Sequence, residues 1–432
     1  MSERIRKRSA DQVPAKTGGN KNVWRKTKQP GNRTTRTCEI QEYCGACSSI
    51  NERYEIGLNR KTEDAVEMFR RAGLLNGVQV TPPFASPQKL EYRCHAKLAV
   101  APAGAVVPEL RKETGRFGIG LYQPGSHEVV PINHCPVHRR QIKRVMFDLE
   151  TCLEESLLTP YNERTHTGDV RHIAIRSAHL TNELMITFVV TREIKNEIKA
   201  IVARLRERGH LISSAQMNIN DTKGNVIFGE ESESVVGSAT MRERICELDV
   251  ELGPTSFFQI NPWQADAMYR RIADLAGRPA KDSVAWDLYC GIGSISLVLA
   301  RQGFKVIGIE ENPHAIANAE RNANKNDVPS PFFMAAKVED AVVGVPQWSR
   351  NPAVIVANPS RRGMDPEARR VVRETLLACK GSRLIYMSCE AETLARDLND
   401  IVGSGVVLRQ IEPYDMFPFT EKMEWLAVVT SN

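Results

Sequence analysis

The sequence predicts an α/β protein whose C-terminal part is a doubly wound parallel sheet and whose central part is of mixed α+β type. From about Pro254 onward, apolar runs typical of buried strands alternate regularly with helical segments. No internal repeat of solenoid or propeller length is present. With 432 residues the chain is also long enough for two or three domains that share ample buried core.

Three regions follow one another along the chain. Residues 1–37 combine eleven Lys and Arg with two acidic residues and lack apolar periodicity, so we expect a flexible basic tail. Such a tail would either attract phosphates without base specificity or act only as a solubilising extension. Residues 38–253 are expected to form the α+β region, with a helix near Thr62–Ala72 that could pack on the C-terminal part, and a strand at Leu184–Val190.

The third region, residues 254–432, alternates strands and helices as a parallel sheet requires. The expected elements are a strand at Val284–Leu288, a helix from Ile295, a strand at Lys305–Ile309, a helix from Pro313, and strands at Ala353–Ala357 and Leu384–Met387.

Composition and charge exclude several classes of protein. The net charge of +6 comes from the first 37 residues, which carry +9, so the rest of the chain carries −3 and is not broadly basic. No apolar run suggests a membrane span or a signal peptide, and we therefore expect a cytoplasmic monomer without membrane partners. Ten cysteines in a reducing compartment are not expected to form disulfides, so metal binding or catalysis must explain any cluster of them.

The turn after the first of the C-terminal strands is a candidate cofactor site. Asp287, Tyr289 and Gly291 lie in the run WDLYCGIG, where glycines let a ligand approach the backbone at the start of a helix. The run lacks the third glycine of a dinucleotide fingerprint, which disfavours a nicotinamide dehydrogenase. Glu310, at the end of the next strand, could accept hydrogen bonds from both hydroxyls of a ribose, or it could simply cap the helix that follows.

Cys389 is a candidate nucleophile because the sequence places it where a core strand meets a helix. The dipole at a helix N-terminus favours the thiolate, which is the reactive form of cysteine. The alternative for a single cysteine at a strand end is a buried packing role. Glu424, just before the apolar strand Leu426–Val429, is a candidate general base, and Glu421 is the weaker choice. For both glutamates the alternative is a solvated surface position.

A group of cysteines near the start of the chain indicates a metal site. Cys38, Cys44 and Cys47 are separated by five and two residues. A tetrahedral or cubane site needs a fourth ligand, and Cys135, which is followed by a proline, is the candidate. Four thiolates alone do not identify the metal, so zinc, an iron-sulfur cluster and unligated cysteines all stay open. Apart from Cys389, the other cysteines are expected to pack in the core.

Several segments together resemble the RNA 5-methyluridine methyltransferase family of bacterial ribosomal and transfer RNA enzymes, over nearly the whole chain after the tail. The matching segments are FFQIN at 257–261, WDLYCGIG at 286–293 with Glu310, NPSRRG at 358–363, Ser388–Cys389 with TLARD at 393–397, and FPFT at 417–420 with Glu424. The resemblance implies a Rossmann-like class I methyltransferase domain that binds S-adenosylmethionine, preceded by an α+β iron-sulfur domain with a [4Fe-4S] cluster at the four cysteines.

The same resemblance implies roles for individual residues. Cys389 would add to carbon 6 of a uridine, which makes carbon 5 nucleophilic enough to take a methyl group. Glu424 would then remove the proton from carbon 5. Gln259 and Asn358 would hold the target base or the polar edge of the cofactor. For this chemistry we expect the target uridine to be flipped or splayed out of its helix.

Two departures from the family pattern lie in the NPSRRG segment. Asn358 stands where transfer-RNA members usually carry aspartate, which favours the branch that acts on 23S ribosomal RNA, and Ser360 replaces a common proline. The run WDLYCG also looks closest to the ribosomal branch. That branch can also lack the N-terminal RNA-binding barrel, for which the 37-residue tail offers no room. The expected partner is therefore 23S ribosomal RNA, with transfer RNA as the alternative and a non-catalytic RNA-binding relic as the third hypothesis. Six basic residues of the central region would either contact phosphates or form a solvated charged face: Arg93, Lys97, Arg139, Arg140, Lys143 and Arg144.

Overall fold

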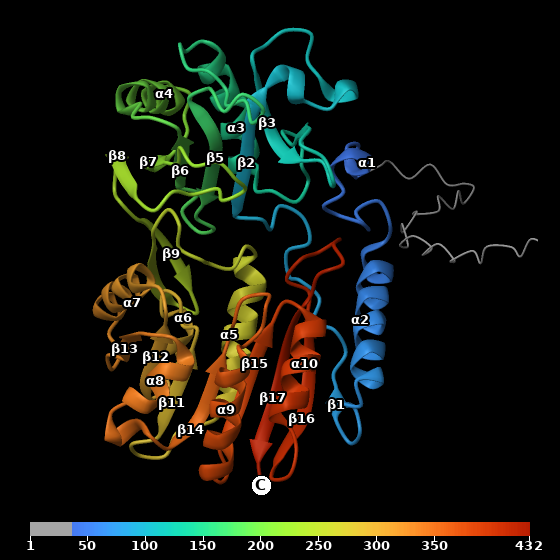
Figure 1. Cartoon of the computed structure of the whole chain (residues 1–432), viewed down its shortest axis with the longest axis vertical. Coiled ribbons are helices and arrows are strands. Elements are labelled where there is room, and N and C mark those ends of the chain that lie inside the picture. Colours follow the sequence, from blue (N-terminus) through green and yellow to red (C-terminus); the bar gives the residue numbers. More distant parts are fainter. Residues whose placement is uncertain (1–36) are drawn as a thin grey trace, which may run out of the picture. The chain divides into compact units, whose positions relative to one another are not determined.

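The computed structural model describes residues 37–432, which form one compact unit. The expected basic tail, apart from its last residue, lies outside the described residues. Two sheets dominate the described chain (Figure 1): a seven-stranded sheet built by the central region and an eight-stranded sheet built mainly by the C-terminal region. No helix between residues 37 and 432 is long and apolar enough to cross a membrane.

The eight-stranded sheet has the order β1-β16-β17-β15-β14-β11-β12-β13. Strands β11 to β15 pair in parallel, whereas β17 runs antiparallel to both β15 and β16. The apolar runs of the sequence become its central strands, as expected. The strand bounds are β1 Gln79–Val80, β11 Val284–Leu288, β12 Lys305–Glu310, β13 Phe332–Ala335, β14 Pro352–Ala357, β15 Arg383–Ser388, β16 Val406–Tyr414 and β17 Glu424–Ser431.

Helices cover both faces of this sheet, which is why its central strands read as continuous apolar runs. One face packs against α2, α8, α9 and α10 in a core that includes Trp286, Tyr386 and Trp425. The other face packs against α5 and α6 in a second core that includes Met268 and Leu297. The helix bounds are α2 Tyr54–Arg71, α5 Pro262–Ala276, α6 Ser294–Arg301, α7 Pro313–Lys325, α8 Val338–Gly344, η3 Gln347–Ser349, α9 Pro366–Ala378 and α10 Ala391–Ile401.

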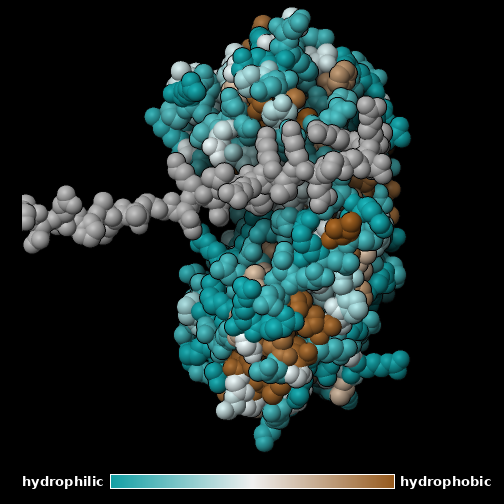
Figure 2. All heavy atoms as spheres, turned by 90° about the vertical axis from the view of Figure 1, so that its right-hand side faces the viewer, coloured by the Kyte–Doolittle hydropathy of each residue, from teal (hydrophilic) through white to brown (hydrophobic). Residues whose placement is uncertain are grey.

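The helix expected near Thr62–Ala72 is α2, and it packs on the C-terminal sheet as anticipated. The rings of Phe69 and Trp425 meet edge to face, with 5.1 Å between their centroids. After α2 the chain adds β1 to the same sheet, parallel to β16. The side of the molecule that carries α2 faces the viewer in Figure 2, where most of its described surface is hydrophilic and the apolar patches concentrate in the lower half.

The seven-stranded sheet has the order β4-β3-β2-β5-β6-β7-β8 and is antiparallel except for the β6–β7 pair, which α4 connects. Helices α3 and α4 cover one face in a core that includes Leu98, Leu149 and Leu205. A two-stranded sheet, β9–β10, follows in sequence. The bounds are α1 Gln41–Cys44, β2 His95–Pro102, η1 Ala103–Ala105, η2 Pro108–Leu110, β3 Phe117–Tyr122, β4 Val129–Pro131, α3 Arg140–Glu154, β5 Val170–Ser177, β6 Leu184–Val190, α4 Lys195–Glu207, β7 Ile212–Ile219, β8 Ser232–Gly237, β9 Met241–Ile245 and β10 Leu248–Leu252.

A buried ion pair ties α2 to the loop that precedes β17. Lys61 Nζ donates to Asp415 Oδ1 at 2.6 Å and to three carbonyl oxygens of residues 417–422 at 3.0 to 3.2 Å. The Tyr54 hydroxyl donates to the second carboxylate oxygen of Asp415 at 2.6 Å. The side chains of Lys61 and Asp415 are 3% and 0% exposed, so each charge depends on the other for compensation. The ion pair therefore fixes the course of the loop.

Lys61→Met should destabilise the protein by about 3–5 kcal/mol, because the Asp415 carboxylate would stay buried without a cation. Urea unfolding followed by circular dichroism measures this loss. The control is Arg370→Ala, which removes an exposed ion pair with Glu367 on α9 and should have little measurable effect. Equal losses from the two variants would contradict the structural role of the buried pair.

Candidate active site

The turn between β11 and α6 lies at the carboxyl ends of the parallel strands. β11 has β12 on one side and β14 on the other, so the strand order reverses at β11. Open α/β sheets bind ligands at such a reversal. Tyr289, Gly291 and Gly293 have φ angles of 61°, 55° and 81° in the left-handed region. A Cβ on Gly293 would also lie 3.0 Å from the Cβ of Ala319, so both the backbone and the packing require glycine there.

Two acidic side chains border this turn. Asp287 is fully buried, and its Oδ2 accepts a hydrogen bond from Ser296 Oγ at 2.6 Å, whereas its Oδ1 has no partner. Burial raises the pKa of Asp287 to about 7. Glu310, the last residue of β12, accepts hydrogen bonds from the amides of Gly291 at 3.2 Å and Asn312 at 3.0 Å. The Glu310 carboxylate thus makes the expected capping contact and also lies against the glycine turn.

Asn358 and Gln259 complete the set of residues that were predicted to hold the cofactor or the target nucleobase. Asn358 follows β14, and its amide donates to the carbonyl of Leu288 at 3.3 Å, which places it beside the turn. Gln259 is buried, and its side chain shares a hydrogen bond with the side chain of Tyr269 from α5. The ends of β11, β12 and β14 therefore gather all the predicted strand-end residues at one edge of the sheet.

The antiparallel pairing of β15 with β17 brings Cys389 and Glu424 together. The last residue pair of the two strands is Ser388 opposite Trp425, and the next residues along the two chains are Cys389 and Glu424. The Glu424 side chain is buried at 3% exposure, whereas Cys389 is half-buried. The negative charge of Glu424 contributes to a raised pKa of Cys389, which is the effect of a close carboxylate. Two residues predicted separately from the sequence thus share one site.

The site favours the neutral forms of both groups. Burial, with a smaller contribution from Glu424, raises the pKa of Cys389 to about 11. We expected the helix N-terminus to favour the thiolate, and burial and the nearby carboxylate act against that effect. Burial likewise raises the pKa of Glu424 to about 8, and its Oε2 has no hydrogen-bond partner.

Arg361 is a site residue that the sequence did not single out. Its guanidinium lies close enough to Cys389 and Glu424 for its positive charge to lower the pKa of both. The loop that carries it is held by Asp397 of α10, which accepts a hydrogen bond from the amide of Met364 at 2.7 Å. A Cβ on Gly363 would lie 2.4 Å from the same carboxylate, so this loop can approach α10 closely only with glycine there. In the sequence, the position of Arg361 three residues after Asn358 could have identified it as a site residue.

Glu421, the weaker candidate for a base, lies elsewhere. Its side chain is 53% exposed and accepts a hydrogen bond from the Ser48 hydroxyl. The structure therefore favours Glu424 of the two glutamates.

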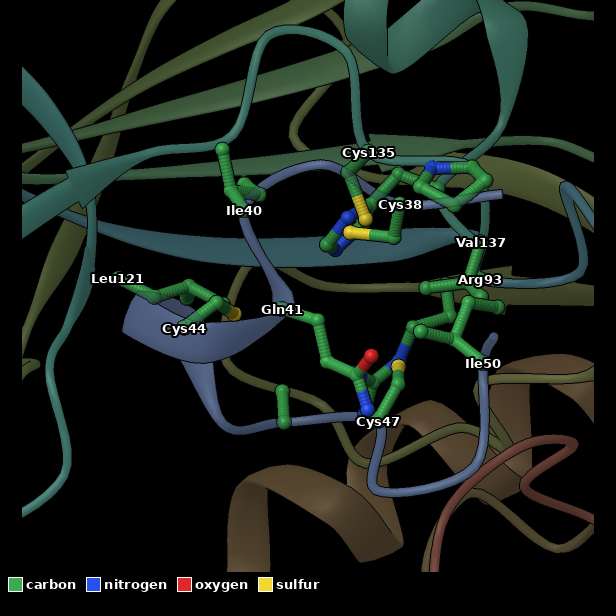
Figure 3. Close-up of a pocket in the computed structure, with 13 residues that line it drawn as sticks. Cys38, Ile40, Gln41, Cys44, Cys47, Ile50, Arg93, Leu121, Cys135 and Val137 are labelled. Atoms are coloured by element: carbon green, nitrogen blue, oxygen red, sulfur yellow. The ribbon is translucent and has the colours of Figure 1, made fainter. Parts of the chain in front are cut away.

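The four cysteines predicted as ligands line one pocket (Figure 3). Cys38, Cys44, Cys47 and Cys135 are all free thiols, and burial, with a smaller contribution from the nearby Cys135, raises the pKa of the other three. Their donor chemistry fits a thiolate-bound metal or cluster. No three His, Cys, Asp or Glu side chains within residues 37–432, however, are grouped closely enough to hold a metal ion. The cysteines thus share a cavity without forming a closed ligand set.

Local structure brings the first three cysteines to the pocket. α1 ends at Cys44 and is capped by Gly45, whose φ of 64° reverses the chain between Cys44 and Cys47. The Asn51 side chain bonds both the amide and the carbonyl of Cys38 at 3.0 Å. Burial raises the pKa of Cys47 to about 12, and the guanidinium of Arg93 in the pocket wall opposes that shift. A cation beside the thiols favours their deprotonation on metal binding.

The cysteine-bearing segment contacts the loop that leads to Glu424. The amide of Ser49 donates to the carbonyl of Phe419 at 3.1 Å, and the Tyr92 hydroxyl donates to the carbonyl of Pro418 at 3.1 Å. Together with the Ser48–Glu421 hydrogen bond, these contacts connect the pocket to the loop beside the active site.

The six basic residues of the central region separate into different environments. Arg139 is buried and donates to the carbonyl of His179 and the side chain of Asn182, so it is structural. Lys143 forms an ion pair with Glu91 at 2.8 Å. Arg140 and Arg144 are exposed, Arg93 lines the cysteine pocket, and Lys97 lies on β2.

Comparison with known proteins gives consistent matches over most of the chain. Residues 84–430 match the tRNA (uracil-5-)-methyltransferase family. An uncharacterized RNA methyltransferase of Listeria monocytogenes is 33% identical over 404 residues, 93% of this chain and 85% of that protein. Another from Oceanobacillus iheyensis is 31% identical over 408 residues, 94% of this chain and 84% of that protein. The Pyrococcus abyssi tRNA (uracil-54, C5)-methyltransferase in complex with S-adenosyl-L-homocysteine has a TM-score of 0.71 and 25% identity, covering 90% of this chain and 85% of that chain.

The doubly wound sheet, with a glycine turn where its strand order reverses, defines an S-adenosylmethionine-dependent methyltransferase fold. The chain belongs to the tRNA (uracil-5-)-methyltransferase family and is an RNA methyltransferase. The expected family, Rossmann-like fold and S-adenosylmethionine cofactor are thereby confirmed. The ribosomal target and the iron-sulfur cluster stay predictions.

Glu424→Gln should stabilise the protein at alkaline pH. The folded pKa of about 8 exceeds the ordinary value of 4.5, so the stability that the protonated group contributes is complete below pH 4.5 and is lost as pH rises through 8. The neutral amide avoids that loss. Urea unfolding at pH 9 should show a gain on the order of a few kcal/mol over the wild type, with little difference at pH 4. If the wild type and the variant had the same free energy of unfolding at pH 9, the Glu424 carboxylate would not be buried without a compensating charge.

Proposed function

We propose that this protein methylates carbon 5 of a uridine in 23S ribosomal RNA, with Cys389 as the nucleophile and Glu424 as the base. The observation that carries the proposal is the pairing of β15 with β17, which sets a thiol beside a buried carboxylate at the edge of the sheet that also bears the glycine turn. The residues proposed to hold the cofactor or the target uracil are Gln259, Asp287, Tyr289, Gly291, Glu310 and Asn358.

The Cys389 thiol gives up its proton to solvent, and the thiolate attacks carbon 6 of the uracil, forming a carbon–sulfur bond and moving the ring electrons toward carbon 5 and oxygen 4. S-adenosylmethionine, when bound, supplies the methyl group that carbon 5 takes. The Glu424 carboxylate then accepts the proton from carbon 5. The electron pair left behind restores the double bond between carbons 5 and 6 and expels the thiolate of Cys389.

The pKa values suit these roles. Glu424, with a pKa of about 8, is poised near neutral pH to accept a proton and release it again. Cys389, with a pKa of about 11, rests as a thiol and is protected from adventitious reaction. Arg361 is the cation that stabilises the thiolate when it forms.

The central region, residues 38–253, is proposed to recognise RNA, and residues 254–432 to carry out the chemistry. Asn358 favours ribosomal RNA as the target. Transfer RNA is the second candidate, because the structurally similar Pyrococcus abyssi enzyme is a tRNA (uracil-54, C5)-methyltransferase. We further propose that the protein acts in the cytoplasm as a monomer.

Methylation of purified RNAs tests this function. With labelled S-adenosylmethionine, the protein should form 5-methyluridine in unmodified 23S ribosomal RNA and not in transfer RNA. Cys389→Ala should lower the rate by more than about a thousandfold, because the covalent route is lost. Cys379→Ala, at another half-buried cysteine, is the control and should keep the wild-type rate. A near-normal rate for Cys389→Ala would refute the mechanism, and label in transfer RNA alone would refute the proposed target.

We also propose that Cys38, Cys44, Cys47 and Cys135 hold a [4Fe-4S] cluster, with structural zinc as the alternative. The free thiols of one pocket and the neighbouring Arg93 support this proposal. The cluster would act as a structural staple, since methyl transfer to an activated uracil needs no electron. Through Ser49 and Tyr92 it would steady the loop before Glu424.

Protein purified without oxygen should contain iron and acid-labile sulfide in equal amounts, and Cys135→Ser should lose both. Cys379→Ser should retain them. Zinc without sulfide would instead identify a structural zinc site, and the absence of any metal from freshly purified protein would contradict both forms of the proposal.

A further inference from the structure

Three of the basic side chains on one face of the seven-stranded sheet occupy neighbouring positions of β2 and β5. β2 and β5 pair antiparallel with His95 opposite Arg176 and Lys97 opposite Ala174. Directly opposed residues project to the same face of a sheet, and positions two apart on a strand do so as well. His95, Lys97 and Arg176 therefore lie on one face, and we call them the basic trio. The opposite face is the one that α3 and α4 cover.

No acidic side chain balances the basic trio. Within residues 37–432, no ion pair joins any of its members to a carboxylate. The four charges that act most strongly on His95 all belong to basic residues, with Arg176 and Lys97 among them. The charge of Arg176, held away from water beside the cation of Lys97, is unfavourable unless an anion accompanies it.

The trio also contains buried donors without acceptors. Arg176 is only 6% exposed, and its Nε has no hydrogen-bond partner; Nε2 of His95, which is a donor in one tautomer of the ring, has no partner either. Arg176 does donate through Nη2 to the carbonyl of Ser256, but a guanidinium has five N–H groups. Because buried polar groups in folded proteins nearly always have partners, these donors indicate an absent acceptor. An oxyanion would satisfy both the charge and the donors.

The trio borders the segment that leads into the candidate active site. Ser256, which Arg176 contacts, lies three residues before Gln259, and the amide of Cys94 donates to the carbonyl of Ile260 at 2.9 Å. Lys97 is exposed, and its Nζ lies 5.1 Å from the ring centroid of Phe228. An anion arriving from solvent would therefore meet Lys97 first and Arg176 more deeply, close to the segment that carries Gln259.

We propose that His95, Lys97 and Arg176 bind a phosphate of the RNA backbone close to the methylated uridine. The inference rests on the proposed function, because it takes RNA to be the substrate. Arginine and lysine are the side chains best suited to phosphate oxygens. A phosphate contact carries no sequence information but fixes the register and orientation of the strand. The trio would thus set which nucleotide can reach Cys389.

Salt dependence of RNA binding tests this site. For an RNA fragment that contains the methylated uridine, Lys97→Ala should reduce the slope of log K against log salt by about 0.7 to 1, as expected for one lost phosphate contact. Arg176→Gln should do the same, and calorimetric binding of S-adenosylmethionine shows whether that variant remains folded. Lys199→Ala, an exposed lysine on α4, is the matched control and should keep the wild-type slope.

Neutral linkages in the RNA locate the contact. Replacing single phosphates by methylphosphonates should weaken wild-type binding at one linkage near the target, and Lys97→Ala should lose nothing further at that linkage. The inference would be overturned if Lys97→Ala kept the wild-type salt slope and lost as much affinity as the wild type when each phosphate was neutralised. That result would leave RNA methylation intact. Failure of the wild type to bind or methylate any RNA would overturn the proposed function and this site together.

Discussion

The antiparallel strand β17, inserted between β15 and β16 of a largely parallel sheet, is the constraint on which the rest of the site depends. Parallel strands present their carboxyl ends at one edge, so only an antiparallel strand can begin at that edge. Because β17 begins with Glu424 and β15 ends just before Cys389, the sheet itself sets the carboxyl group beside the thiol. Strand pairing thus positions the two catalytic groups more rigidly than a flexible loop would.

Burial has opposite consequences for chemistry and for stability at this edge. Exclusion of water raises the pKa of Glu424 to about 8, which makes its carboxylate a suitable proton acceptor. The same exclusion leaves Oε2 of Glu424 without a hydrogen-bond partner. The surrounding structure must therefore hold the loop before Glu424 in place. Lys61 of α2 holds it through Asp415, Ser49 holds it from the segment after Cys47, and Tyr92 holds it from the chain before β2. The N-terminal segments thus support the C-terminal site.

Much of this architecture could be predicted from the sequence, because strands that are buried on both faces leave continuous apolar runs: β11 and β6 have the predicted bounds. The glycine turn and Cys389 were recognisable because backbone freedom and a strand-to-helix junction leave local signals. The raised pKa of Cys389 was not predictable, since it depends on how deeply the thiol is buried and on a carboxylate distant in sequence. The contacts of Lys61 and Arg361 were also missed, because each joins segments that are distant in the sequence and come together only in the folded chain.

The central claim is that Glu424 removes the carbon 5 proton from the ring to which Cys389 is bonded. Its most direct test uses RNA with tritium at carbon 5 of the target uridine. The wild type should release one tritium to water for each methyl group transferred. Glu424→Gln should still transfer a methyl group but release tritium at least about a hundredfold more slowly. Release at the wild-type rate from that variant would contradict the account.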